Sequence, residues 1–267
     1  MAESVDLGSV QETLLVPLYG RAVDARRRSS VLSDARAAEM VDEIDHDFST
    51  FSTPNTVGSV WRAAVFDGFV RDFLAEHPDG TVADLGCGLS TRFDRVDNGR
   101  VTWLDVDLED SIALRRRFVD DGDRYTMRVG SIFDTDWYSA IDAGKPVLLL
   151  SEGVLLYFHA DEVEEALRSI AAAFPGARFA FDTSGAAMVA GQDKTHADVP
   201  ARFHWACDDP AELEKCGLRL LESYSFAKPP KGLVASWPLL HRAGIRLVGR
   251  MPVSKAYRFN LFECARR

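Results

Sequence analysis

The chain has 267 residues, 46% hydrophobic and 27% charged, which is ordinary for one large soluble domain or two small ones. Its net charge of −10 argues against partners that are nucleic acids or anionic membranes, because both are themselves negatively charged. The four cysteines are scattered and form no CxxC pair, so the sequence predicts neither a metal site nor a disulfide framework.

The first residues, Met1 to Asp6, are acidic and lack the apolar segment of a signal peptide. The longest apolar run, around Pro146 to Leu150, is far too short to span a bilayer. We therefore expect a cytoplasmic protein.

Three helices are predicted before any strand, over residues 9–27, 33–46 and 58–76. Ser33 is the expected N-cap of the second helix, and the sequence His77-Pro78-Asp79-Gly80 ends the third. No linker separates these helices from the rest of the chain. We predict that residues 1–80 form a helical cap packed on a core domain of residues 81–267.

From Thr81 onward, strand and helix patterns alternate, which predicts an α/β fold with a parallel sheet covered on both faces. The last strand alternates large apolar and polar residues, which suits an antiparallel edge strand. The predicted strands are 81–85, 101–106, 125–130, 146–151, 177–182, 218–226 and 257–264, and the predicted helices lie near 108–119, 135–142, 160–173 and 209–216.

Two segments, 183–208 and 228–255, interrupt this alternation and are rich in Gly, Pro and polar residues. Both follow strands on or near the side where ligands bind. We predict that they form substrate walls or lids.

The most informative stretch is Val82-Ala-Asp-Leu-Gly-Cys-Gly-Leu-Ser90, in which an apolar strand ends in an acid and two glycines follow. Glycines at 86 and 88 permit a tight turn and a close approach of the backbone to a ligand. A turn after the first strand of an α/β sheet is where nucleotides bind. An ordinary turn between strand and helix is the alternative.

Polar residues also follow the next strands of the predicted sheet. Asp105 and Asp107 end the second strand, and a carboxylate there can accept two hydrogen bonds from a ribose diol; Asp107 as a helix N-cap is the alternative. Ser131 and Ile132 could bond and cover an adenine, or form a plain turn. Glu152 ends a buried apolar strand beside the glycine turn, where a cationic ligand group such as an ammonium is its expected partner.

Two nucleotide-binding classes share this opening turn. Dinucleotide dehydrogenases need G-x-G-x-x-G, and Thr91 occupies the third glycine position. A reductase-like Tyr-x-x-x-Lys pair, Tyr224 and Lys228, falls in a predicted strand and its exit, not on a helix. S-adenosylmethionine enzymes need the turn, a ribose acid, an adenine slot and charged groups for the methionine moiety, and the chain has all four in order.

On these residues the chain resembles the leucine carboxyl methyltransferase family, and within it the smaller bacterial polyketide-synthesis O-methyltransferases of the tetracenomycin P type. The resemblance implies a class I methyltransferase Rossmann-like fold. The matching stretches are Glu12 to Ala22, Val60-Trp-Arg62, Asp84 to Arg92, Trp103 to Leu108 and Ser151 to Phe158.

The resemblance implies roles for individual residues. Arg62 matches the arginine that grips the methionine carboxylate, and Asp107 matches the ribose acid, with Asp105 in place of the family's glutamate. Tyr157 matches a tyrosine placed toward the acceptor and is the catalytic candidate. The predicted cofactor-binding residues are Arg62, Asp84, Gly86, Gly88, Asp105, Asp107, Ser131, Ile132 and Glu152, and the predicted substrate-binding residues are Tyr19, Arg21 and His204. Ser90, where many family members have Asp, is a further departure from the family pattern. These departures weaken any inference of this chain's substrate from that of other family members.

The predicted reaction transfers a methyl group from S-adenosylmethionine to a carboxylate or phenol of a small metabolite. A carboxylate is already ionised at neutral pH and needs no base, whereas a phenol would gain from one. Because the sequence shows no unambiguous base, a carboxylate is favoured. A nicotinamide-dependent reductase and a non-catalytic cofactor-binding protein remain as alternatives, and the oligomeric state is left open.

Overall fold

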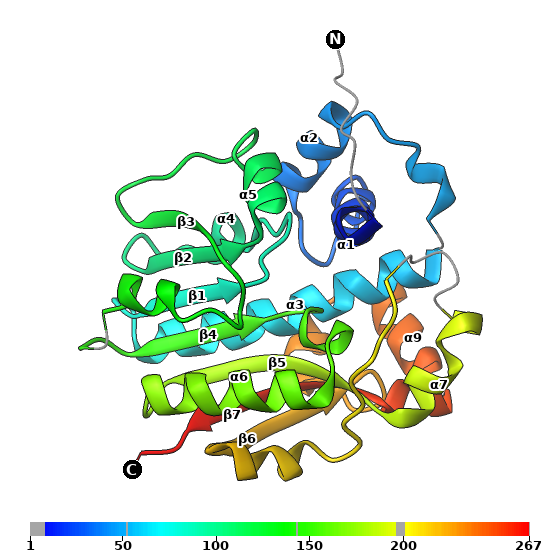
Figure 1. Cartoon of the computed structure of the whole chain (residues 1–267). Coiled ribbons are helices and arrows are strands. Elements are labelled where there is room, and N and C mark those ends of the chain that lie inside the picture. The colour runs from blue at the N-terminus through cyan, green and yellow to red at the C-terminus, as the bar shows by residue number, and fades with distance from the viewer. Residues whose placement is uncertain (1–8, 52, 143, 196–200, 267) are drawn as a thin grey trace.

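The computed structural model describes residues 9–51, 53–142, 144–195 and 201–266. These residues form one mixed β-sheet with helices on both of its faces (Figure 1). The seven strands are β1 (Thr81–Leu85), β2 (Thr102–Asp107), β3 (Tyr125–Val129), β4 (Val147–Ser151), β5 (Arg178–Ser184), β6 (Leu218–Ser225) and β7 (Tyr257–Cys264). Their spatial order is β3-β2-β1-β4-β5-β7-β6. The predicted α/β, mostly parallel seven-stranded sheet is thereby confirmed.

The antiparallel strand is β7, as predicted, but it is not at the edge. It pairs antiparallel with β5 on one side and with β6 on the other, so that β6 forms the edge. The polar residues that suggested an exposed strand are accommodated differently. Asn260 is fully buried and bonds to both neighbouring strands, accepting from Ser223 and donating to Thr183.

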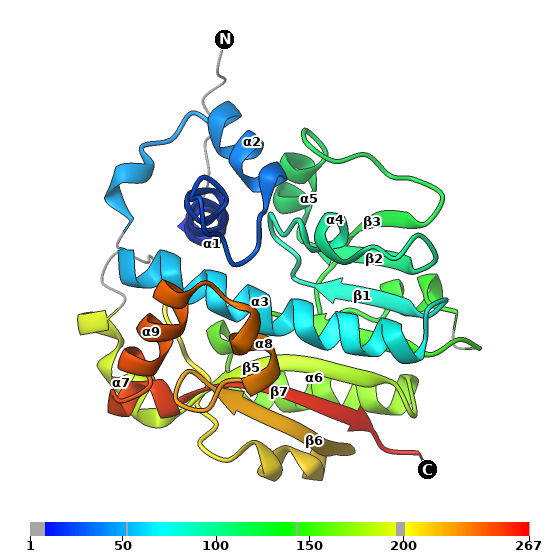
Figure 2. The ribbon, with the colours of Figure 1, turned by 180° about the vertical axis from the view of Figure 1, so that it is seen from behind.

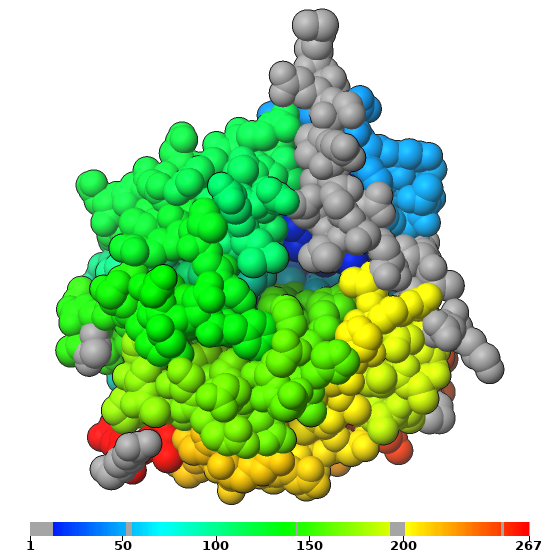
Figure 3. Space-filling view, viewed as in Figure 1, coloured from blue at the N-terminus to red at the C-terminus, as the bar shows by residue number. Residues whose placement is uncertain are grey.

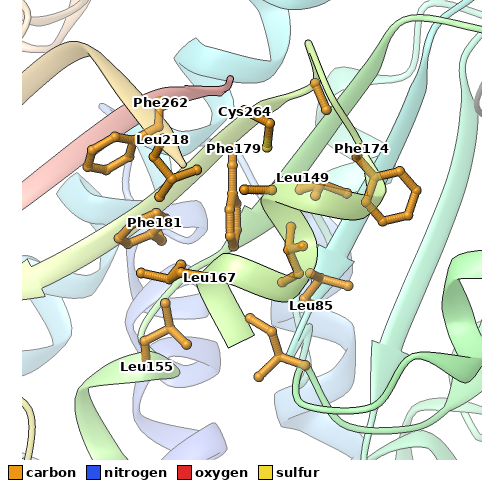
Figure 4. Close-up of a cluster of buried hydrophobic side chains, with 14 of the residues drawn as sticks. Leu85, Leu149, Leu155, Leu167, Phe174, Phe179, Phe181, Leu218, Phe262 and Cys264 are labelled. Atoms are coloured by element: carbon orange, nitrogen blue, oxygen red, sulfur yellow. The ribbon is translucent and has the colours of Figure 1, made fainter. Parts of the chain in front are cut away.

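Alternate side chains of the strands enter two separate cores. On one face lie α6 (Ala160–Ala173) and the 3₁₀ helices η2 (Asp136–Ala140) and η4 (Pro210–Cys216). Figure 4 shows the centre of this core, where Leu167 of α6 lies among Leu149, Phe179 and Phe181 of the sheet. On the other face lie α3 (Thr53–Glu76) and α5 (Glu109–Arg115).

The helices before β1 divide into two groups. Helix α3 shares its buried residues with the sheet, so it is a layer of the core. The helices α1 (Ser9–Ala25) and α2 (Ala35–Glu43), with η1 (Phe48–Thr50), lie beyond the carboxyl ends of the strands and have a small core of their own (Figure 1). Among the described residues of the predicted cap, α1, α2 and η1 are the elements that lie over this end of the sheet. The short helix α4 (Arg92–Val96) follows the glycine turn.

The two segments predicted to be irregular contain further helices. The first holds α7 (Ala186–Thr195), and the second holds α8 (Lys231–Ser236), α9 (Leu239–Val248) and η5 (Pro252–Lys255). Both α8 and α9 lie outside α3, where Trp237 and Ile245 pack on Trp61 (Figure 2). Within the part of the chain that the structure describes, every helix is too short or too polar to cross a membrane.

We expect Asn260→Ala to lower the free energy of unfolding by ~2–4 kcal/mol, because it leaves the buried Thr183 hydroxyl and Phe181 carbonyl without their donor. The measurement is urea denaturation followed by circular dichroism. Ser223→Ala is the matched control. It removes the other partner of Asn260 at a half-buried position that water can reach, so its cost should be clearly smaller. Equal costs would contradict this account of β7.

Candidate functional site

A cavity of about 790 Å³ opens at the carboxyl ends of β1, β2 and β4, between the sheet and α1. It lies where β1 is flanked by β2 and β4, the switch point at which such sheets bind ligands. In the space-filling view this face is hollowed, and the dark blue of α1 is visible deep inside (Figure 3). Its volume is in the range of small-molecule and cofactor sites. Lining residues include Leu14, Arg21, Arg62, Asp84, Gly86, Gly88, Arg92, Asp107, Ser131, Ile132, Glu152, Tyr157 and His204.

The glycine turn forms one wall of this cavity. Gly86 and Gly88 have φ values of +74° and +50°, which side chains disfavour. A Cβ on Gly86 would collide with Val154, and one on Gly88 would come within 2.9 Å of Leu14. The backbone N–H of Gly86 donates to the carbonyl of Val106 (2.7 Å), which fixes the turn against β2. The turn therefore requires both glycines and presents bare backbone to the cavity.

Asp107 lines the cavity at the end of β2. Its carboxylate accepts from the backbone N–H of Gly88 (2.6 Å) and of Leu108 (2.7 Å), so it holds the glycine turn and the start of α5. Burial raises the pKa of Asp107, and these two N–H groups act in the opposite direction. Because a carboxylate has about four acceptor positions, the side chain can accept further hydrogen bonds from a ligand.

Asp105 is placed elsewhere than predicted. It is buried beneath the turn, does not line the cavity, and pairs with Arg115 (2.5 Å) while accepting from Trp103 (2.7 Å) and Tyr125. Arg115 also donates to the carbonyl of Gly88 (3.0 Å). Asp105 thus supports the turn from below, and its position gives it no access to a ribose.

Ser131 and Ile132 lie beside Asp107 on the cavity wall, at the end of β3. The backbone N–H of Ser131 donates to Asp134 (2.7 Å), and its carbonyl accepts from the Trp137 indole (3.1 Å). Ile132 is buried against the core of the α6 face. These bonds show that Ser131 belongs to a turn, and both residues line the cavity; the adenine contact stays a prediction.

Glu152 lines the cavity but already has cationic partners within the protein. Arg62 donates to one carboxylate oxygen (2.8 Å) and Arg92 to the other. Burial alone would raise the pKa of Glu152, but Arg92 and Arg62 outweigh it and the pKa is lowered. The carboxylate therefore has cationic partners without a ligand, and its contact with a ligand ammonium stays a prediction. The signal missed in the sequence is Arg92, 60 residues earlier in the chain.

Arg92 is the centre of a buried ion-pair network. Its guanidinium contacts Asp67 of α3 (3.0 Å), Asp84 of β1 (2.5 Å) and Glu152 after β4. One turn on, Arg95 pairs with Asp67 (2.8 Å) and Asp34 (2.7 Å). Neither arginine was assigned a role from the sequence, although both lie on the helix that follows the glycine turn.

Arg21 connects the cap to this network. It pairs with Asp34 (3.0 Å), donates to the carbonyl of Leu89 (2.6 Å) and lines the cavity. Burial lowers the pKa of Arg21 to about 10, and Asp34 acts against this shift. The predicted substrate-binding residue is thus also a structural link between α1, α2 and the glycine turn.

Of the remaining residues predicted to contact the acceptor, two line the cavity and one does not. Tyr157 lines the cavity, and its ring centroid lies 5.3 Å from that of Phe203. Burial raises the pKa of Tyr157, with Arg62 acting in the opposite direction, so its hydroxyl is a donor at neutral pH. His204 lies at the rim and is exposed. Tyr19 does not line the cavity, because it is stacked on Phe48 in the aromatic cluster of the cap.

The two predicted wall segments also differ. Ala201, Arg202 and His204 of the first segment line the cavity, whereas no described residue of 228–255 does. That second prediction is therefore wrong for the described residues, and residues 196–200 lie outside them. Tyr224 and Lys228 are likewise away from the cavity. All four cysteines are buried and unpaired, and no cluster of three metal-ligating side chains occurs within the described ranges.

Comparisons with known proteins agree with this geometry. A sequence profile described as leucine carboxyl methyltransferase matches residues 15–171. The chain is 35% identical over 86% of its length, and 88% of the relative's, to the tetracenomycin polyketide synthesis O-methyltransferase TcmP of Streptomyces glaucescens. It is 31% identical, over 79% of each chain, to the S-adenosyl-L-methionine-dependent methyltransferase dpfgK of Gibberella zeae.

A similar fold occurs in the magnesium protoporphyrin IX methyltransferase ChlM of Synechocystis, solved with bound S-adenosylhomocysteine. The TM-score is 0.52 at 10% identity, covering 95% of this chain and all of the other. At this identity the likeness concerns the fold alone.

The network makes stability depend on pH at Asp34. Burial would raise its pKa, but Arg95 and Arg21 outweigh it, so the pKa is lowered on folding. This stabilisation is full above the unfolded pKa of about 3.9 and is lost as pH falls through the folded value. We expect Asp34→Asn to destabilise the protein by ~3–5 kcal/mol at pH 7, with a deficit that shrinks below about pH 4.

Thermal unfolding at several pH values measures this effect. Asp42→Asn is the matched control, because Asp42 also pairs with an arginine, Arg26, but at an exposed position. It should change stability little at any pH. A deficit of Asp34→Asn that stays constant down to pH 3 would contradict the assignment.

Proposed function

The chain belongs to the leucine carboxyl methyltransferase family and is an S-adenosylmethionine-dependent methyltransferase, and from this we propose that it methylates an oxygen of a small-molecule acceptor, preferably a carboxylate. The observation that carries the proposal is the cavity. Its lining includes both a glycine turn suited to the cofactor and Arg21, Tyr157 and His204. The relative named as a polyketide synthesis O-methyltransferase supports both oxygen as the atom methylated and a polyketide-like acceptor.

We assign the nucleoside part of the cofactor to the side of the cavity next to β2 and β3. Asp107 would accept hydrogen bonds from the ribose hydroxyls, because its carboxylate faces the cavity beside the turn. Ser131 and Ile132 would contact the adenine. Gly86 and Gly88 leave room for the ligand against the backbone, where a Cβ would intrude.

The methionine moiety fits the floor formed by Arg62, Asp84, Arg92 and Glu152. In this floor the arginines and carboxylates are already paired. A zwitterion, with one ammonium and one carboxylate, can exchange hydrogen bonds with such a set without burying a net charge. Arg62 would hold the ligand carboxylate, and its bonds to Glu152 and Tyr257 (3.0 Å) fix the guanidinium in place.

The cofactor supplies a methyl group that its sulfonium already activates. The protein's contribution is therefore to hold the acceptor oxygen in line with that methyl group and to exclude competing water. Tyr157 would donate a hydrogen bond that orients the acceptor, because its raised pKa keeps the hydroxyl protonated. Arg21, which lines the cavity, would attract an anionic acceptor.

A carboxylate acceptor is favoured because few side chains that line the cavity could act as a general base. Glu152 is held by two arginines, and among the described lining residues His204 is the one imidazole. A carboxylate needs no proton removed, whereas a phenol with a pKa of about 10 does. His204 is the residue that a phenol acceptor would require.

We expect Asp107→Asn to weaken S-adenosylmethionine and S-adenosylhomocysteine binding roughly 10- to 100-fold, because a charge-assisted hydrogen bond to the ribose is lost. Isothermal titration calorimetry measures the two dissociation constants. Asp105→Asn is the matched control two residues away. It should lower the melting temperature by leaving Arg115 unpaired, and it should affect the affinity less. Unchanged affinity in Asp107→Asn would remove Asp107 from the cofactor site.

The acceptor class is tested with an aromatic acid and a phenol that share one ring skeleton. We expect the acid to be methylated at a rate that changes little between pH 6 and 9, because it is ionised throughout. Tyr157→Phe should lower kcat/KM for this acid about tenfold with unchanged cofactor affinity. The measurement is the initial rate of S-adenosylhomocysteine formation.

Two results would contradict these assignments. Turnover of the phenol alone, lost in His204→Ala, would replace the carboxylate with a phenol and make His204 the base. Cofactor binding without turnover of any acid or phenol in a polyketide-like set would instead indicate a binding protein on this fold.

A further inference from the structure

Residues 223–262, none of which lines the cavity in the described part of the chain, have an unusual charge. Between Ser223 and Phe262 the chain has seven basic residues and no acidic one. Subtracting these seven from the 31 basic residues of the chain leaves 24 basic against 41 acidic residues, a net charge of −17 on the rest. An acid-free segment within so acidic a chain concentrates positive charge in one region.

The structure brings this charge to the surface together with apolar side chains. Leu239, Leu240, Leu247 and Met251 are 77%, 75%, 67% and 52% exposed. In the same segment of the chain, the basic residues Lys228, Lys231, Arg246, Arg250 and Lys255 are also exposed. We call these nine residues the α8–α9 surface. Within the described residues, no carboxylate pairs with any of its five cations.

The elements that present the α8–α9 surface are packed against α3. Trp237 and Ile245 are buried against Trp61 of α3, and the Trp61 indole donates to Nδ1 of His241 (3.1 Å). A Cβ on Gly244 would come within 3.2 Å of Trp61, so α9 lies close against α3. The inner side of α9 thus accounts for its packing, and its exposed leucines do not serve the core. Exposed apolar side chains that gather in one place mark interaction sites.

We propose that the α8–α9 surface docks an acidic protein partner, which presents carboxylates around an apolar centre. Opposite charges would steer the encounter, and the four apolar side chains would be buried on contact. The proposal does not depend on the acceptor, since none of the nine residues of this surface lines the cavity.

Two other occupants fit less well. A symmetric dimer through this surface would bring the cations of both copies into one interface without carboxylates from this surface, which is repulsive. An anionic bilayer is flat and extends beyond the surface, so it would also face the body of the protein, which carries −17. A protein partner contacts only the surface that it fits.

The test uses a synthetic helical peptide with Leu at i, i+3 and i+4 spacing and Glu at the flanking positions, and its counterpart with Lys in place of Glu. Fluorescence anisotropy with the full chain should give binding of the Glu peptide, weaker at 200 mM than at 50 mM salt, and no binding of the Lys peptide. The double variant Arg246→Glu/Arg250→Glu should weaken binding at least tenfold, and Leu240→Ser/Leu247→Ser likewise.

The matched control is Arg128→Glu/Lys145→Glu, which reverses two exposed charges elsewhere on the chain and should leave the affinity unchanged. All three double variants should keep the wild-type melting temperature and cofactor affinity, because none of their residues lines the cavity or is buried. A loss of peptide binding would therefore report on the surface and not on the methyltransferase site.

Three results would overturn the proposal. The first is failure of the Glu peptide to bind, or an equal affinity for wild type and Arg246→Glu/Arg250→Glu. The second is cosedimentation with vesicles of 30% phosphatidylglycerol that the same variant abolishes, which would assign the surface to membranes. The third is a dimer in light scattering that Leu240→Ser/Leu247→Ser dissociates, which would assign it to a second copy of the chain.

Discussion

The contact of Arg92 with three carboxylates is the interaction on which the rest of the site depends. Asp67, Asp84 and Glu152 come from α3, β1 and the end of β4, and each is buried or nearly so. A buried carboxylate without a partner is strongly destabilising, so these three elements can meet only around a cation. Since Asp84 lies two residues before Gly86, the same contact fixes where the glycine turn begins. Arg95, Asp34 and Arg21 extend the pairing to α1 and α2, and so hold the cap over the cavity.

Features with local causes could be predicted from the sequence. The seven strands follow from apolar runs bounded by turn residues, and the need for glycine at 86 and 88 follows from the turn between β1 and α4. Asp105 and Asp107 show where local pattern is insufficient. They differ by two residues and project to the same side of β2, but one lies under the turn beside Arg115 and the other at its open edge.

Features that depend on contacts distant in sequence could not be predicted. Glu152 was expected to need a ligand cation because its partners, Arg62 and Arg92, are 90 and 60 residues away. The interior position of β7 likewise depends on Asn260 bonding to strands on both sides, and an alternating pattern alone does not distinguish such a strand from an edge. The helices α8 and α9 were missed because their Gly and Pro residues resemble those of a loop.

Helix α3 explains why those two helices are present. It faces the sheet with Phe66 and Val70, the cavity with Arg62, and the outside of the core with Trp61 and Ala64. A helix that is apolar on nearly all sides must be covered on all of them, or it exposes a large apolar area. Trp237 and Ile245 provide the cover for Trp61, and packing requires no more than this inner side of α8 and α9. Their outer side therefore does not contribute to packing of the fold. Its exposed leucines and cations are better explained by binding to another molecule than by stability.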